Sequence, residues 1–226
     1  MSATTLPRRS AQDPYQLGRR SSHGGGGGHD HSTGHGGGGP SSKFIVVGYG
    51  FWIFLLSDIV MFSAFFAAHG VLSQNYAGGP TGAQLFDLKR VALETGALLL
   101  SSFTCGLSSV AAHQRRTWQT EFWLLITGLL GAGFLVLEIS EFVGMIDQGA
   151  GPQRSAFLSS FFAVVGLHGL HVSAGLLWLG TMMAQIWVKG FRADIRRRLL
   201  CFNLFWHALD IIWVALFTVV YLLGAG

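Results

Sequence analysis

The chain has 226 residues, of which 50% are hydrophobic and 12% charged, and its mean hydropathy is +0.45. Ordinary soluble domains are about 25% charged, so this composition excludes that class. The net charge of +4 comes from short basic segments between apolar runs, and it gives no reason to expect a nucleic-acid partner.

Residues 1–42 differ from the rest, because they combine glycine runs with four histidines and contain no apolar run: His23, His29, His31 and His35. A segment that cannot bury apolar surface is typical of disorder. Glycine imposes no ligand geometry, so we expect a solvated arm rather than a specific metal site.

Five apolar runs follow, at about 44–72, 91–112, 120–142, 157–188 and 199–223. A helix needs about 20 apolar residues to cross a bilayer, and each run supplies that number. The runs lack the alternation of barrel strands, which are about 10 residues long. We therefore predict an all-α membrane protein: a disordered N-terminal arm over residues 1–42 and a bundle of five transmembrane helices over residues 43–226.

The basic residues predict the orientation of these helices. Twelve of the fifteen lysines and arginines fall in the N-terminal segment and the second and fourth loops, and three lie on the opposite side: Lys89, Arg90 and Arg154. Cytoplasmic loops carry the excess of basic residues. We expect a multi-pass membrane protein with a cytoplasmic N-terminus and a periplasmic C-terminus.

Five ionisable residues fall near mid-membrane: Asp58, His168, His171, His207 and Asp210. They lie about 12 to 21 Å along their helices, at about 1.5 Å per residue. A carboxylate facing lipid is costly, so we expect both aspartates to face the bundle interior, either protonated or paired. The i, i+3 spacing places His168 and His171 on one helix face. It also places His207 and Asp210 on one face of their helix.

Four interpretations of this layer remain open. The three histidines supply enough nitrogens for a metal site, and one or two of them suffice as axial ligands of a haem. A third interpretation is a hydrogen-bonded polar layer that joins the first, fourth and fifth helices. A fourth is a proton or ion path, which buried carboxyl groups often mark. The pattern alone favours the hydrogen-bonded layer.

Three further acids need less explanation. Glu94 lies one turn inside the second run, and Glu138 and Glu141 lie near the outer end of the third, where we expect them to reach water. Two interpretations of these residues remain, interfacial or interhelical pairing and a proton path, and we expect the pairing. Small residues such as Gly131 and Gly169 predict close helix contacts.

Two long motifs carry a resemblance. GLHGLHV at 166–172 and WHALDIIWVALF at 206–217 match the patterns GxHGxHV and WHxxDxxWxxxF. The chain resembles subunit III of the haem-copper terminal oxidases, from about Lys43 to its end. The stretches GFWIFLLSDIVMFSAFFAAHG and NYAGGPTGAQLFDL most resemble the quinol-oxidising, cytochrome bo-type branch of bacteria.

The resemblance implies a non-catalytic subunit of a proton-pumping ubiquinol oxidase in the bacterial inner membrane. Subunit I holds the haems and copper, and this chain stabilises subunit I, retains phospholipid and helps to sustain proton uptake. The implied partners are subunit I, the other oxidase subunits and membrane lipids, with ubiquinol reached only through the complex. No catalytic, cofactor-binding or metal residue is then expected here, and the mid-membrane residues are structural. Three mid-membrane histidines are also too few to hold two haems and a copper.

Two alternatives remain beside this function. Subunit III of a cytochrome c oxidase has the same pattern but serves another electron donor. A small proton channel or transporter would use Asp58, His171 and Asp210 as a relay. The chain shows no internal duplication of the kind that many transporters contain.

Overall fold

The computed structural model describes residues 43–76, 78, 87–190, 192–222 and 224. The arm predicted for residues 1–42 lies outside these ranges. The described residues form five long helices and no strand: α1 (Lys43–Leu72), α3 (Leu88–His113), α4 (Thr117–Asp147), α5 (Ala156–Lys189) and α6 (Ala193–Leu216). A π-helical segment, η1 (Phe217–Leu222), continues α6. All five helices are long and apolar enough to cross a membrane, so the predicted fold class is confirmed.

The helices extend beyond the apolar runs. The largest extension is at the start of α6, which begins at Ala193 rather than at about residue 199, and α4 reaches Asp147 rather than residue 142. The N-termini of α3 and α5 are each capped by a side chain. Asp87 Oδ1 accepts from the Lys89 backbone N–H at 3.1 Å, and Ser155 Oγ accepts from the Leu158 N–H at 3.2 Å. Such caps satisfy N–H groups that have no partner within the helix.

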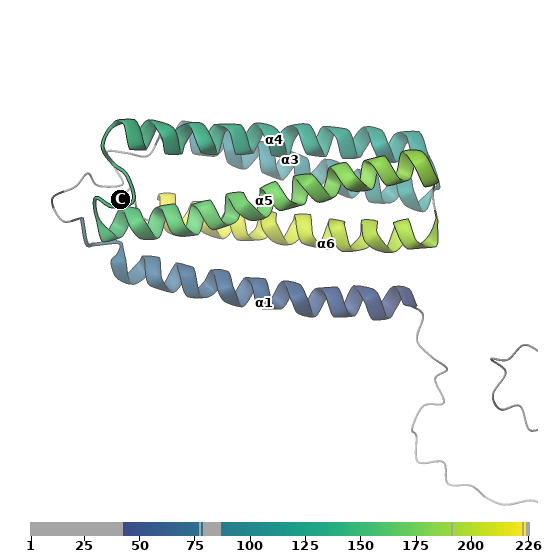
Figure 1. Ribbon diagram of the computed structural model, residues 1–226, viewed down its shortest axis with the longest axis horizontal. Coiled ribbons are helices and arrows are strands. Elements are labelled where there is room, and N and C mark those ends of the chain that lie inside the picture. The colour runs from purple at the N-terminus through teal and green to yellow at the C-terminus, as the bar shows by residue number, and fades with distance from the viewer. Residues whose placement is uncertain (1–42, 77, 79–86, 191, 223, 225–226) are drawn as a thin grey trace, which may run out of the picture. The chain divides into compact units, whose positions relative to one another are not determined.

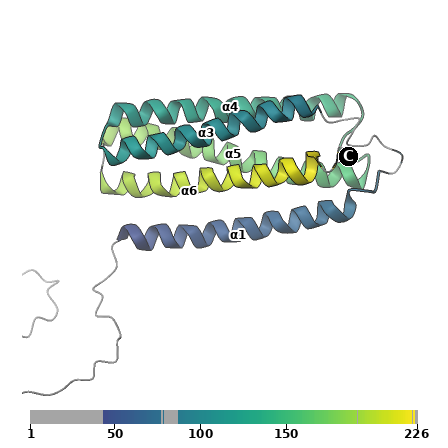
Figure 2. The ribbon, with the colours of Figure 1, turned by 180° about the vertical axis from the view of Figure 1, so that it is seen from behind.

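The helices pack as two pairs with α1 beside them. α3 lies along α4, and α5 and α6 pack against that pair and against each other. α1 packs mainly on α5 and α6, on the side away from α4 (Figures 1 and 2). Most of the apolar side chains of α1 are exposed, including Trp52, Phe54 and Val60.

A tryptophan side chain occupies the centre of the four-helix contact. The Trp206 ring of α6 is buried between two glycines, Gly131 of α4 and Gly175 of α5. A Cβ added at these glycines would lie 2.8 Å from Cζ2 and 2.9 Å from Cζ3 of the ring, respectively. The prediction that small residues allow close helix packing is confirmed at Gly131, and also at Gly169, where a Cβ would lie 2.7 Å from Glu138.

Candidate functional site

The structure places His207 and Asp210 against α3. His207 Nδ1 lies 2.6 Å from the Ser102 hydroxyl oxygen. The Asp210 carboxyl group lies beside the same hydroxyl and the His207 ring, and its Oδ1 atom is buried without a hydrogen-bond partner among the described residues. The shared helix face predicted for this pair is therefore a contact with α3.

His168 and His171 face a different part of the bundle. The His168 ring of α5 is fully buried among aromatic rings of three other helices: Phe62 at 6.5 Å, Phe134 at 5.8 Å and Trp213 at 5.1 Å between ring centroids. Neither ring nitrogen has a hydrogen-bond partner within the described ranges. His171 Nδ1–H donates to the Leu167 carbonyl at 2.8 Å.

Asp58 joins neither pair. It is half-buried on α1, and no hydrogen bond or ion pair links it to another described residue. The five residues predicted as one layer thus form two separate pairs and one isolated carboxyl group. The three histidines have different neighbours, and the described residues contain no group of three or more histidine, cysteine or acidic side chains placed to hold a metal ion. This arrangement does not favour the metal interpretation.

A row of polar pairs between α3 and α6, which we name the α3–α6 seam, was not predicted. Its members are hydrogen-bonded pairs: Thr95 with Trp213, Ser101 with Trp206, Ser102 with His207 and Cys105 with Asn203. The two indole N–H groups each donate to a hydroxyl oxygen at 3.0 Å. Serine and threonine on one helix opposite tryptophan, histidine and asparagine on another are the sequence signal for such a seam.

A second missed contact ties α1 to the bundle. The His69 ring is 2% exposed, and its Nδ1 atom lies 2.9 Å from the Ser160 hydroxyl oxygen of α5. The rest of the α1 contact is largely apolar, so this bond fixes its register against α5.

Three carboxyl groups gather where α3 begins and α4 ends: Glu94, Glu138 and Glu141. They are 0%, 2% and 8% exposed. The prediction that Glu138 and Glu141 reach water is wrong, because α4 continues past them and α5 and η1 cover them. Glu94 pairs within its own helix, with Arg90 at 3.7 Å, whereas Glu141 pairs between elements and accepts from the Tyr221 hydroxyl of η1 at 3.4 Å.

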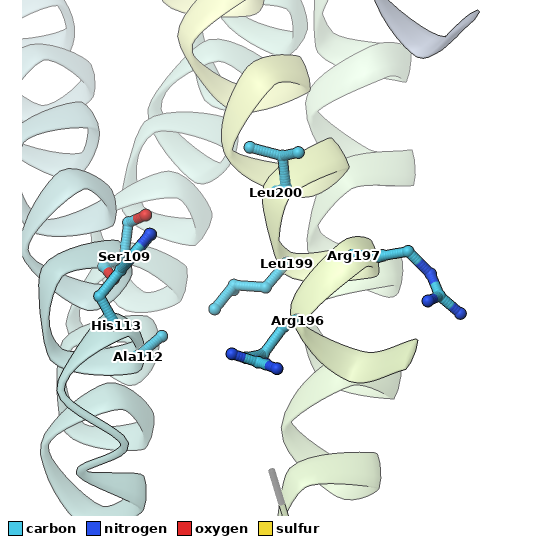
Figure 3. A pocket seen from close by; sticks show the side chains of 7 residues that line it. All are labelled: Ser109, Ala112, His113, Arg196, Arg197, Leu199 and Leu200. Carbon is cyan, nitrogen blue, oxygen red and sulfur yellow. The ribbon is translucent and has the colours of Figure 1, made fainter. Parts of the chain in front are cut away.

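At the opposite end of α3 lies a pocket of about 340 Å³. Its lining residues come from α3 and α6: Ser109, Ala112, His113, Arg196, Arg197, Leu199 and Leu200. Figure 3 shows the Arg196 side chain directed toward α3, whereas Arg197 points away from it. A hydroxyl, an imidazole and a guanidinium beside leucine side chains fit an anionic headgroup with an apolar tail.

Known proteins resemble this chain over most of its length. Residues 37–225 match the family model described as cytochrome c oxidase subunit III. The cytochrome bo(3) ubiquinol oxidase subunit 3 of Pseudomonas aeruginosa is 53% identical over 177 residues, which cover 78% of this chain and 85% of that protein. The quinol oxidase subunit 3 of Bacillus subtilis is 42% identical over 180 residues, covering 78% of this chain and 87% of that protein. The chain belongs to the cytochrome c oxidase subunit III family.

Proposed function

We propose that this chain is the non-catalytic subunit III of a proton-translocating ubiquinol oxidase of the bacterial inner membrane. The observation that carries the proposal is the similarity to proteins named as quinol oxidase subunit 3, at 53% and 42% identity across most of their length. The five apolar helices fit such a multi-pass subunit. The positive-inside rule supports a cytoplasmic N-terminus and a periplasmic C-terminus.

The role proposed for the mid-membrane residues is structural. His207 and Asp210 bind α6 to α3 through Ser102, and His168 fills an aromatic core that includes side chains from α1, α4 and α6. Asp58 has no partner within the described chain, so we assign it to the contact with lipid or subunit I. The haems and copper of subunit I supply the electron transfer and oxygen reduction, and this chain supports that subunit and its proton uptake.

Phospholipid retention is the second part of the proposal, and the pocket between α3 and α6 supports it. Arg196 and His113 lie on the side with most of the basic residues, which the charge rule places at the cytoplasmic surface. Anionic lipids are attracted to such basic positions. Leu199 and Leu200 then contact the apolar part of the lipid.

One alternative has an observation in its favour. The family model is described by cytochrome c oxidase, whose electron donor is a protein rather than a quinol. The relatives named as quinol oxidases favour the quinol. Measuring oxygen consumption by the purified complex with ubiquinol and with reduced cytochrome c separates the two.

The deciding experiment is purification in mild detergent through a tag at the C-terminus. The copurifying subunits are identified, and a reduced-minus-oxidised spectrum is recorded before and after this chain is stripped away. The proposal requires a larger partner that keeps its haem after stripping. Haem that remains with this chain would refute a non-catalytic role and would make His168 and His171 the first candidate ligands.

A further inference from the structure

The buried carboxyl groups near the start of α3 have no role in the proposed function. Glu94 comes from α3, and Glu138 and Glu141 come from adjacent turns of α4. Each of the three interacts electrostatically with at least one of the others, so they form one group. We name these three residues the carboxyl cluster.

The charge of the cluster is not balanced by its neighbours. Arg90 is the cation beside it, at 3.7 Å from Glu94, and its side chain is 34% exposed. Its Nη2 atom donates to the Leu137 carbonyl at 2.8 Å and to the Ser140 hydroxyl, both on α4. These acceptors are neutral, so one guanidinium balances at most one carboxylate, and two carboxyl groups are left.

Glu138 provides a separate observation, because its carboxyl group is inserted between helices. The side chain is 2% exposed, and Oε2 has no hydrogen-bond partner among the described residues. Its oxygen atoms are directed at α5, where Gly169 leaves the space: a Cβ there would lie 2.7 Å from Oε1 and 3.0 Å from Oε2. A charged carboxylate in such a niche lacks both water and a counterion.

The surrounding elements add no second cation at the contacts described. α5 contributes Gly169 next to Glu138, and η1 contributes the Tyr221 hydroxyl, which donates to Glu141. Asp87, just before α3, adds a further negative charge near Glu141. Two carboxylates that share a site cannot both remain charged without compensation.

We propose that the carboxyl cluster is a proton-binding site that holds two protons while Arg90 is charged. One carboxylate is balanced by Arg90, and the other two groups are carboxylic acids, with Glu138 as one of them. The protons are shared within the cluster, since the groups interact and titrate as a unit. Exchange with the aqueous phase passes the neighbouring Arg90, whose side chain is partly exposed. This inference does not depend on which electron donor the complex uses.

The test is infrared spectroscopy of the intact complex containing this chain, with isotope-labelled glutamate to separate carboxylic-acid bands from lipid esters. The band of the cluster is identified as the glutamate carboxylic-acid band whose intensity changes in both Arg90→Gln and Glu138→Gln. In Glu138→Gln, Arg90 still holds one carboxylate, so one proton remains and the cluster band falls to about one half. In Arg90→Gln the balancing cation is lost, so a third proton enters and the band rises by about one half.

The control is Asp147→Asn, an exposed position at the end of the same helix, which should leave the cluster band unchanged. Assembly of Glu138→Gln is itself expected, because an amide has nearly the shape of a protonated acid. If that variant does not assemble, Glu94→Gln takes its place and should also lower the band by about one half. An unchanged acid band in the assembled variants, or failure of both glutamine variants to assemble, overturns the proposal.

Discussion

The tight contact between Trp206 and Gly131 yields the most specific prediction about stability. Replacing Gly131 by alanine places a Cβ atom 2.8 Å from Cζ2 and 2.9 Å from Cη2 of the indole. The ring cannot move away easily, because its Nε1–H donates to Ser101 at 3.0 Å and Gly175 lies beside its Cζ3 atom. Overpacking of this kind costs about 1 to 3 kcal/mol.

Gly133→Ala is the matched control. It lies on the same helix, and a Cβ there meets nothing within 4 Å. Both substitutions add about 1 kcal/mol of helix propensity, so the difference between the two variants isolates the packing term. We expect Gly131→Ala to be less stable than Gly133→Ala by about 1 to 3 kcal/mol.

The assay is thermal and detergent-induced loss of this chain from the purified complex. In the presence of Trp206→Phe, Gly131→Ala should cost less stability than it costs alone, because the smaller ring makes room for the methyl group. Equal stability of the two alanine variants, or strict additivity in the double variant, would show that the ring and Gly131 are not in tight contact.

Three other predictions concern the polar residues His207, Asp58 and Arg196. His207→Ala removes one of the two α6 side chains that meet the Ser102 hydroxyl, and it should loosen the association of this chain while the haem spectrum of the assembled complex stays intact. Loss of haem would contradict a structural role. Asp58→Asn should fold and assemble almost normally, since asparagine has nearly the same size and shape as aspartate, and failure of the chain to accumulate would show that the carboxyl group itself is needed. Arg196→Gln should reduce the anionic phospholipid that copurifies, as measured by mass spectrometry, whereas Arg198→Gln, whose side chain bonds Gln185 instead, should not; equal loss in both would remove the pocket as the lipid site.

The helices were predictable because the bilayer fixes their length. Runs of apolar residues had to be about 20 residues long, and polar connectors separated them. The ends were less predictable, as at Asp147, because a helix can continue into water once its apolar part has crossed the membrane. The family resemblance rested on two sequence motifs, and the similarity to known subunit III proteins confirms the family.

The partners of the polar residues were not predictable from spacing alone. Residues at i and i+3 share a face, but the sequence does not say which neighbour that face meets, because the spans are apolar on nearly all sides. His168 and His207 therefore looked like members of one layer, although one meets aromatic rings and the other meets Ser102. Glu138 looked accessible from its depth, yet Gly169 on another helix accommodates its carboxyl group.

Polar side chains on α3 hold this bundle together through hydrogen bonds between uncharged groups. Ser101 Oγ donates to the Leu98 carbonyl at 2.7 Å within its own helix and accepts from the Trp206 indole at 3.0 Å. A hydroxyl has both a donor and acceptor lone pairs, so one serine satisfies itself and a neighbouring helix together. Thr95 repeats the arrangement, with the Val91 carbonyl as its acceptor and Trp213 as its donor. Because indole N–H groups have no acceptor of their own and lipid offers none, these two hydroxyls determine where α6 lies against α3.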